Sequence, residues 1–219
     1  MEYLKRIAMP KSWPIARKKG KGKYISKPRA FLGRSLTILV ILRDILKLAK
    51  TRDEIKKIIR SSEILINNKK INNEVFPVQL FDSISIPKIN KFYKLILTKS
   101  GKLAVKEINA AESIKKVCKI IDKISLKGNK IQINLNDGRN FISKEGNVND
   151  SVIIDLKQNK VLGILKLKEK SNVIIIKGKK AGNTGIISKI EEKNKKRIIH
   201  IKTDEGEIKL SLKNIMIIE

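Results

Sequence analysis

The sequence has few of the residues that most enzymes and metal sites require. It contains one histidine, His200, and one cysteine, Cys118. A histidine-assisted nucleophile or a zinc site needs partners of these types, so neither is expected. A single cysteine forms no internal disulfide, which agrees with a reducing, cytoplasmic location. We interpret His200 as a structural residue of an apolar strand and Cys118 as a buried thiol on an apolar helix face.

Acidic residues are also scarce, and those present have local roles in the sequence. Asp44 lies one turn from Lys47, Asp137 lies in a turn, and Asp82 and Asp150 stand at the starts of strands. No two are spaced to converge as an acid and base pair. The sequence therefore predicts no catalytic residue, no cofactor, no metal and no small-molecule substrate.

Aromatic residues make up only 4% of the chain, and long hydrophobic runs are missing. Proteins that stack splayed RNA bases need aromatic side chains, so this scarcity favours recognition of phosphates and shape. The apolar run 36–42 ends at Arg43 and Asp44, far short of a membrane span, and begins too late for a secretory signal. Proline and glycine in the basic leader spoil the amphipathic helix of a transit peptide. No membrane association is expected.

Positive charge is abundant instead. Fifty Lys and Arg face 21 Asp and Glu, so the formal net charge is +29 and the pI is near 10.2. A coding bias towards lysine does not account for the shortage of acids. An excess of this size predicts a polyanionic partner; nucleic acid is the first candidate, and an anionic membrane surface ranks second and is not the expected partner.

Residues 1–34 form a strongly basic segment that proline and glycine interrupt. Its expected RNA contacts are Lys5, Arg6, Lys11, Trp13, Arg17, Lys18, Lys19, Lys21, Lys23, Arg29 and Arg34. Such a segment buries too little apolar surface to order itself alone. We predict an extended arm that orders along RNA phosphates, an interpretation that Trp13, Tyr3 and Tyr24 favour over a solvated tail.

Residues 35–61 are predicted to form two helices. In residues 36–50, Ile38, Leu42, Ile45 and Ala49 recur at helical spacing, with Arg43, Lys47 and Lys50 on another face. Thr51 and Glu54 form a capping box that leaves no room for a loop. The second helix is expected to bury Ile55, Ile58 and Ile59 and to present Arg52, Lys56, Lys57 and Arg60. Two successive basic faces indicate an interaction surface.

A basic hairpin is predicted next. A short strand runs into Asn67 and Asn68, which tolerate the positive φ of a tight turn, and Lys69 and Lys70 follow. Residues 77–86 are predicted to form one closing strand. Residues 35–91 thus make a small unit with one positive surface.

The remainder is predicted to be mostly strands. In residues 92–170 we expect strands at 92–98, 131–135, 152–156 and 161–167 and a hairpin at Asp137-Gly138. We also expect one helix that Asn109 caps. The inner face of this helix is expected to carry Ile114, Val117, Cys118, Ile121 and Ile124. Strands at 173–176, 185–190, 197–202 and 207–210 suggest a small C-terminal barrel in residues 171–219.

The loop KGKKAGNTGII (residues 177–187) has the composition of a phosphate-binding loop. It matches neither the P-loop pattern nor the dinucleotide pattern, and strands rather than a helix follow it. Its glycines are expected to turn the chain between strands and to let the backbone approach a phosphate. Lys179, Lys180, Asn183 and Thr184 are its candidate RNA contacts.

Together these segments resemble the archaeal and eukaryotic small-subunit ribosomal protein S-four-e family along the whole chain. The resemblance rests on LKRIAMPKSW (4–13), on LRD (42–44), INNK (66–69) and FDSI (81–84), which resemble an S-four RNA-binding module, on LNDGRN (135–140), and on GKKAGNTGII (178–187), which is similar to a KOW motif. Two positions depart from the family pattern: Asn68 replaces the usual hairpin glycine, and Phe81 stands where glycine is common in S-four modules.

The resemblance implies an α+β fold: an extended arm (1–34), an S-four-like module of two helices and a hairpin (35–91), a central β-rich domain with one helix (92–170), and a KOW-type, SH3-like barrel (171–219). It implies a structural constituent of the small ribosomal subunit that binds ribosomal RNA beside neighbouring ribosomal proteins and supports translation and subunit assembly. Contact residues carried over from the module are Arg43, Lys47, Arg52, Lys56, Asn68 and Lys69. The short leader and compact C-terminus favour an archaeal source.

Two other functions stay open. An RNA-modifying enzyme with an S-four module, such as a pseudouridine synthase, needs a catalytic aspartate in a sizeable domain of its own. A KOW transcription or assembly factor would associate with polymerase or with precursor particles rather than with mature subunits.

Overall fold

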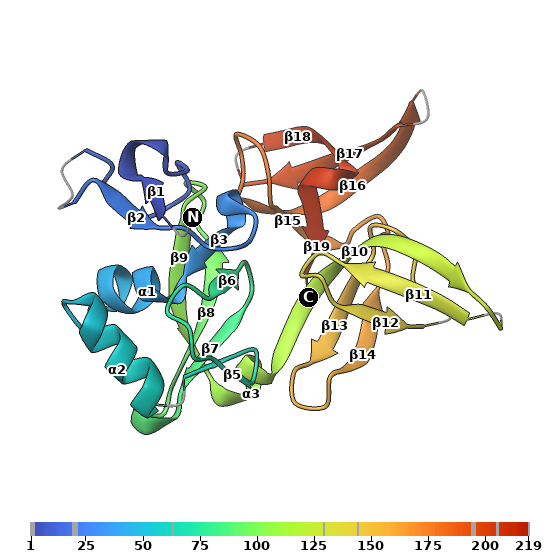
Figure 1. Cartoon of the computed structure of the whole chain (residues 1–219). Coiled ribbons are helices and arrows are strands. Elements are labelled where there is room, and N and C mark those ends of the chain that lie inside the picture. Colours follow the sequence, from blue (N-terminus) through green and yellow to red (C-terminus); the bar gives the residue numbers. More distant parts are fainter. Residues whose placement is uncertain are drawn as a thin grey trace. The chain divides into compact units, whose positions relative to one another are not determined.

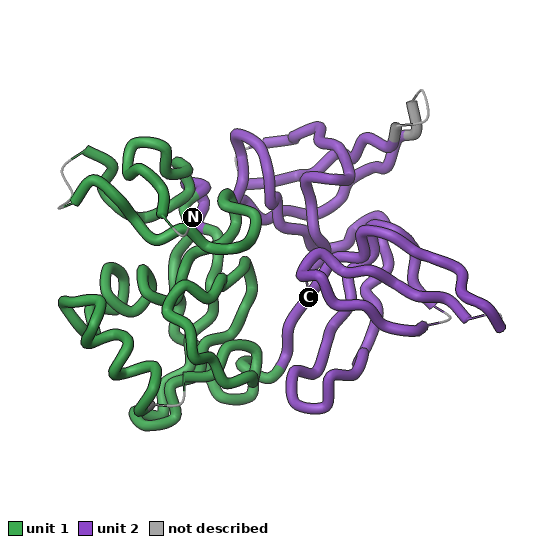
Figure 2. Tube along the Cα trace, in the orientation of Figure 1, with its two compact units in different colours: residues 1–97, 102–114 green, residues 98–101, 115–219 purple. Residues whose placement is uncertain are grey.

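The computed structural model describes residues 3–18, 22–62, 64–128, 130–143, 145–193, 196–204 and 206–218. Strands dominate, and the helices are few and short (Figure 1). The chain divides into two compact units, Met1–Leu97 with Lys102–Ile114, and Thr98–Gly101 with Lys115–Glu219 (Figure 2). The expectation of a strand-rich protein with few helices is confirmed.

The N-terminal segment is folded, so the expectation that it cannot order itself is wrong for the described residues. Strand β1 (Tyr3–Lys5) pairs antiparallel with β2 (Tyr24–Ser26), and short 3-10 turns follow at Arg6–Ala8 and Leu32–Arg34. The indole of Trp13 is only 2% exposed, and its Nε1 donates a hydrogen bond to the Leu32 carbonyl at 2.9 Å. Met9 and Ile25 are buried as well. Burial of these large side chains offsets the entropy lost on ordering.

The first of the two expected helices is shorter than predicted. Residues Ser35–Thr37 form strand β3, which pairs with β6 (Pro77–Gln79), and helix α1 (Ile38–Val40) continues only as a π-helical stretch, Ile41–Ile45. The helix ends there, and Lys47 adopts a left-handed φ of 53°. Residues 46–51 therefore separate the helices, and the basic face predicted through Lys47 and Lys50 does not form.

The second helix forms as predicted. Helix α2 spans Arg52–Ser62 and buries Ile55 and Ile59. The capping box is confirmed: the Glu54 N–H donates to Thr51 Oγ1 at 3.2 Å, and Glu54 Oε2 accepts from the Thr51 N–H at 3.4 Å. The cap satisfies backbone donors that the first turn would otherwise leave unpaired.

One sheet of five strands organises the first unit. Its order is β5-β4-β7-β8-β9, with β4 Leu65–Ile66, β5 Lys69–Lys70, β7 Ser83–Ile86, β8 Lys91–Leu97 and β9 Leu103–Ile108. The tight turn at Asn67 and Asn68 is confirmed, with φ of 50° and 62°. The continuous strand expected over residues 77–86 is wrong, because the chain turns at Phe81, whose φ is 68°, and β6 and β7 join different sheets.

The helix predicted from Asn109 to Ile124 is also wrong beyond its first turn. Helix α3 spans only Ala110–Ile114, and Lys115–Leu126 form the long strand β10. This strand pairs with β11 on one side and β13 on the other, and it places Cys118 and Ile120 in the core. The segment is rich in β-branched residues, and pairing on both edges outweighs its helical spacing.

Strand β10 lies at the centre of a second antiparallel sheet of five strands, ordered β12-β11-β10-β13-β14. The other strands are β11 Lys130–Leu135, β12 Asn140–Ile142, β13 Ser151–Asp155 and β14 Lys160–Leu165. Strands β11, β13 and β14 and the Asp137-Gly138 hairpin agree with the prediction, whereas β12 was not anticipated; Gly138 has the expected positive φ of 87°.

The C-terminal strands form a third antiparallel sheet, ordered β18-β17-β16-β15-β19. They are β15 Asn172–Ile175, β16 Thr184–Lys193, β17 Lys196–Thr203, β18 Gly206–Ser211 and β19 Ile215–Ile217, with a 3-10 turn at Leu212–Asn214. The four predicted strands are confirmed, and β19 was not anticipated. In the described part of the chain the end strands β18 and β19 do not pair, so closure into a barrel stays a prediction.

Candidate nucleic-acid interface

The N-terminal segment presents its lysines to solvent but uses two of its arginines internally. Lys5, Lys11, Lys18, Lys23 and Arg29 are exposed. Arg6 is 9% exposed, and it donates from Nε to the Gly22 carbonyl at 3.0 Å and from Nη1 to the Ala16 carbonyl at 3.1 Å. Arg17 donates to the Met9 carbonyl. Arg6 and Arg17 therefore hold the segment's own backbone together. Lys19 and Lys21 lie outside the described residues.

Two other predicted RNA contacts of this segment, Trp13 and Arg34, are less accessible than expected because their side chains are buried or half-buried. Trp13 lies in the interior, so in this conformation its ring is not available to stack on a base. Arg34 is half-buried, and burial lowers the pKa of its guanidinium, which lies 5.8 Å from the Phe31 ring centre. Trp13, one of the three aromatic residues that favoured an RNA-binding arm, is thus a core residue.

Two arginines predicted on basic helix faces have acidic partners. Arg43 donates to both carboxylate oxygens of Asp44, at 3.0 and 2.9 Å, and this hydrogen bonding raises the pKa of Arg43. Arg52 donates to Glu74 Oε1 at 3.0 and 2.5 Å, which raises the pKa of Arg52. The Arg43 pair is bidentate, both Arg52 donors share one Glu74 oxygen, and in each pair the carboxylate partly offsets the charge of the arginine.

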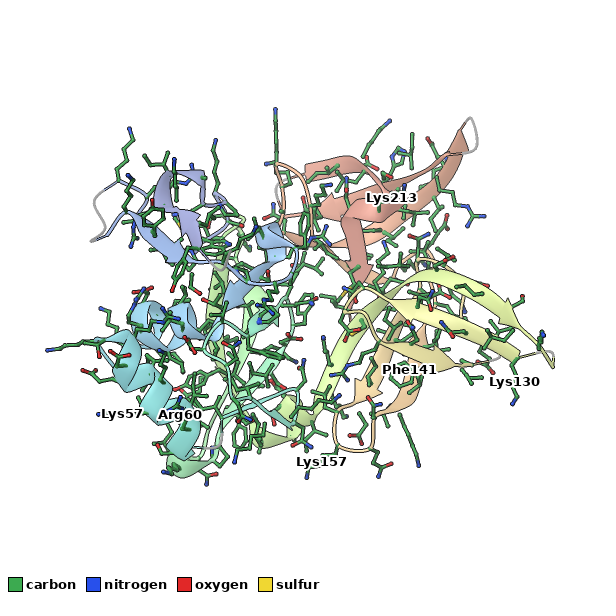
Figure 3. All side chains as sticks on the ribbon, viewed as in Figure 1. Lys57, Arg60, Lys130, Phe141, Lys157 and Lys213 are labelled. Carbon is green, nitrogen blue, oxygen red and sulfur yellow. The ribbon has the colours of Figure 1, made fainter. Side chains whose placement is uncertain are left out.

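The exposed cations of α2 are Lys57 and Arg60 (Figure 3). Neither has a hydrogen bond or an ion pair within the described part of the chain. Lys56 lies 3.8 Å from Asp53, and exposed Lys47 lies beyond the end of the first helix. The basic face of α2 is therefore formed chiefly by Lys57 and Arg60.

The hairpin presents Asn68, Lys69 and Lys70 at the β5 edge of the sheet, where all three are exposed. Asn67 and Asp82, which are not among the candidate site residues expected from the sequence, hold the hairpin in place. Asn67 Nδ2 donates to Asp82 Oδ1 at 2.8 Å, and Asn67 Oδ1 accepts from the Ser83 N–H at 3.2 Å. The other oxygen of buried Asp82 accepts from the Gln79 N–H at 2.7 Å. An asparagine at a left-handed turn position was the available sequence signal.

The loop between β15 and β16 presents Lys179 and Lys180 to solvent, and Thr184, the first residue of β16, is exposed as well. Asn183 is 5% exposed, and its Oδ1 has no hydrogen-bond partner among the described residues. Gly182 has a φ of 95°, and a Cβ there would lie 1.8 Å from the Thr98 carbonyl oxygen. The expected turn is confirmed, and Gly182 is required by close packing as well as by backbone conformation.

A further basic surface was missed at the sequence level. Lys166, Lys168 and Lys170 line a groove of about 400 Å³ whose apolar part includes Ile164 and Ile217. The backbone between the lysines is held in place, because the Leu167 N–H donates to Oδ1 of buried Asp150 at 2.8 Å. The alternating lysines of LKLKEK (165–170) were the available signal.

His200 and Cys118, the single histidine and the single cysteine, are both buried on strands, which indicates a structural role. His200 is buried on β17, with Nδ1 3.2 Å from Glu207 and Nε2 3.2 Å from Glu191. Cys118 is buried on β10 rather than on a helix. The described residues contain no cluster of three His, Cys, Asp or Glu suited to a metal ion. They also include no helix long and apolar enough to span a membrane.

These features define a strongly basic, strand-rich protein, and its candidate interface comprises exposed cations on one helix, one hairpin, two loops and a folded N-terminal segment. The profile of the family described as "Ribosomal family S4e" matches residues 89–161. "Small ribosomal subunit protein eS4" of Methanocella arvoryzae is 35% identical over 211 residues, which cover 94% of this chain and 88% of that protein. The protein of the same name from Nanoarchaeum equitans is 34% identical and covers 86% of this chain and 82% of its own length.

A solved structure is similar as well. The crystal structure of the 30S ribosomal protein S4e from Thermoplasma acidophilum matches with a TM-score of 0.73 at 28% identity, over 84% of this chain and 95% of that one. The chain belongs to the S4e family of ribosomal proteins. The family resemblance noted from the sequence is confirmed, and the relatives are named as small ribosomal subunit proteins, with no enzymatic activity in their names.

Proposed function

We propose that this S4e-family chain is a structural constituent of the small ribosomal subunit that binds ribosomal RNA and supports translation and subunit assembly. The observation that carries the proposal is the placement of exposed, unneutralised cations, above all Lys57 and Arg60 on α2 and Lys69 in the adjoining hairpin, on a chain of net charge +29. Exposed cations on rigid elements bind phosphates at fixed positions, which suits a folded RNA.

We assign a separate proposed role to each of four segments. Residues 1–34 hold RNA through exposed lysines, residues 35–91 act as an S-four-like module, residues 92–170 form a central β-rich part, and residues 171–219 act as a KOW-type barrel. Strands β8 and β9 complete the sheet of the preceding module, so the central part contributes to the module's stability. The groove with Lys166, Lys168 and Lys170 is an additional phosphate surface.

The proposed mechanism is electrostatic adhesion with a fit of shape. Each phosphate that a lysine or arginine neutralises releases a condensed counterion. The hairpin, α2 and the folded N-terminal segment set the position of the protein on the RNA. Small-subunit ribosomal RNA and neighbouring ribosomal proteins are the proposed partners, and the cytoplasmic ribosome is the proposed location.

Sedimentation of a native extract through a sucrose gradient, with the protein located by mass spectrometry, tests the proposal. We expect the protein in mature small subunits, and we expect the purified chain to bind small-subunit ribosomal RNA in dilute buffer. Location only in polymerase complexes or precursor particles would favour an assembly or transcription factor instead. Isomerised uridine in an added transcript would favour a modification enzyme.

A further inference from the structure

The few aromatic side chains of this protein are unevenly distributed between core and surface. Tyr3, Tyr24 and Phe31 are 49%, 56% and 68% exposed. All three lie in the N-terminal segment, whereas Trp13 in the same segment and Tyr93 in β8 are buried. Exposed aromatic rings are unfavourable in water unless a partner covers them, so their concentration in one segment calls for a partner.

Each of these three rings has a cation beside it. Lys23 Nζ lies 5.8 Å from the centre of the Tyr24 ring, and Arg34 Cζ lies 5.8 Å from that of Phe31. Arg52 Cζ lies 5.7 Å from the Tyr3 ring, and its Nη1 also donates to the Tyr3 hydroxyl at 2.6 Å. A cation at this distance is attracted by the ring quadrupole. Each exposed ring of the segment therefore has a cationic side chain beside it, and at Tyr24 this is the exposed Lys23, which has no acidic partner among the ion pairs of the described residues.

The two tyrosines lie on one face of the β1–β2 ribbon. Lys5 is directly opposite Tyr24 in the antiparallel register, and Tyr3 is two residues from Lys5 on the same strand. Because side chains alternate across a strand, Tyr3, Lys5 and Tyr24 share a face. The intervening Ile25 points to the other face and is buried. The ribbon is thus anchored through Ile25 on one face, and its other face carries the exposed Tyr3, Lys5 and Tyr24 beside the buried Ser26.

Phe31 is held in place although it is the most exposed of the three rings. A Cβ at Gly33 would lie 3.0 Å from Cε1 of Phe31, so the ring packs directly over this glycine. The Phe31 carbonyl accepts hydrogen bonds from Ser35 Oγ at 2.7 Å and from the Arg34 N–H at 3.2 Å. A ring that is fixed before binding loses little conformational entropy when a partner stacks on it.

We propose that Tyr3, Tyr24 and Phe31 form a surface on which unpaired bases of RNA stack. This inference rests on the proposed function and adds base recognition to it. RNA is favoured over a protein partner because each ring adjoins a lysine or arginine in a segment that also exposes Lys5, Lys11 and Lys18. Stacking on aromatic rings next to a basic groove is how proteins hold single-stranded nucleic acid. The low aromatic content of the chain suggested the opposite, that bases are not stacked.

The test compares Tyr24→Leu, Phe31→Leu and their double variant with the full-length wild type for binding to small-subunit ribosomal RNA over a salt series. We expect each single variant to bind about 5- to 150-fold more weakly, the range measured when a stacking aromatic is removed. The slope of log affinity against log salt should stay unchanged, because no cation is lost. Phe76→Leu is the matched control, since Phe76 is 38% exposed outside this segment, and its affinity should equal the wild-type value.

Unchanged affinity in the double variant would overturn the proposal, as would an equal loss in Phe76→Leu or a reduced salt slope. Fluorescence of the buried Trp13 confirms that each variant is folded, because the indole lies in the core of the same segment. Ultraviolet crosslinking in the intact subunit provides a second measurement. Crosslinks from Tyr24 or Phe31 to nucleotides support the proposal, and crosslinks to a protein neighbour contradict it. If the wild-type chain itself binds no ribosomal RNA, the proposed function fails first.

Discussion

At the scale of single residues, the least expected feature is a buried cation in the central sheet. Lys116 is only 2% exposed, and its Nζ lies 2.8 Å from Asp137 Oδ2. Arg139 Nε lies 3.4 Å from the same oxygen, and Cys118 Sγ also contacts it. Burial alone would raise the pKa of Asp137, but the charges of Lys116 and Arg139 more than offset this and hold it below its usual value.

Breaking this pair should destabilise the protein strongly. Asp137→Asn is expected to lower the free energy of unfolding by about 3–5 kcal/mol at neutral pH, because it leaves the Lys116 ammonium buried without a counter-charge. A double variant, Lys116→Met with Asp137→Leu, removes both charges and should lose much less. Urea unfolding measures both. Equal losses in the single and double variants would show that the charge pair is not the cause.

The same pair predicts a dependence of stability on pH. Asp137 has a lower pKa in the folded state than the value of about 3.9 expected in the unfolded chain. Its contribution to stability is therefore complete above that unfolded-state value and is lost as pH falls through the folded-state pKa. The stability difference between wild type and Asp137→Asn should be constant from pH 7 to pH 5 and should shrink below about pH 4. A constant difference down to pH 2 would contradict this.

At the scale of elements, the basic hairpin depends on the Asn67-Asn68 turn and on the hydrogen bonds of the Asn67 amide to Asp82 and Ser83, which form a clamp. Asn67→Ala removes the amide that bonds to Asp82 and to the Ser83 backbone, and it leaves a buried carboxylate oxygen without that donor. We expect a loss of about 1–3 kcal/mol in unfolding free energy, with weaker binding to ribosomal RNA. Asn68→Gly is the matched control for the free energy of unfolding only, since Asn68 is itself a candidate RNA contact and glycine adopts the positive φ of this position without strain. Similar behaviour of the two variants would mean that the clamp does not position the hairpin.

The N-terminal segment gives a second prediction at this scale. Trp13→Ala should cost about 3–5 kcal/mol of the packing that orders residues 3–34, because a large buried ring is removed. Trypsin should then cleave after Lys11, Lys18 and Lys23 faster than in the wild type. Phe76→Ala removes a partly exposed ring elsewhere and should leave these cleavage rates unchanged. Equal cleavage of wild type and Trp13→Ala would show that Trp13 does not hold the segment.

At the scale of the whole molecule, the net charge of +29 predicts strongly salt-dependent RNA binding. With about ten phosphate contacts, affinity should fall by roughly 10³–10⁵ between 50 and 200 mM salt. Replacing Lys57 and Arg60 with glutamine should reduce the log–log salt slope by about 2, one for each lost contact. Filter-binding titrations over a salt series measure the slope.

A charge-matched variant separates placement from charge alone. Lys130→Gln with Lys157→Gln removes two exposed cations from hairpins of the central sheet (Figure 3). Its slope should remain closer to that of the wild type. An equal reduction in both double variants would mean that net charge, rather than the face of α2, determines binding.

The chain's composition and short motifs determined a large part of this description. The charge excess, the scarcity of histidine and cysteine, the capping box at Thr51 and Glu54, and the turns at Asn67-Asn68 and Asp137-Gly138 are encoded by residues a few positions apart. Local backbone preferences and capping hydrogen bonds act over that range, so sequence patterns report them directly. The order of the motifs also sufficed to indicate the family.

Tertiary pairing decided the rest. Residues 115–126 have helical spacing but form β10, because strands from distant parts of the chain pair along both of its edges. Whether Arg52 faces solvent or Glu74, and whether Trp13 or Phe31 is the exposed ring of the N-terminal segment, depends on what the folded chain brings alongside each residue. Burial and ion pairing are properties of neighbours in space, so no pattern along the chain could assign them.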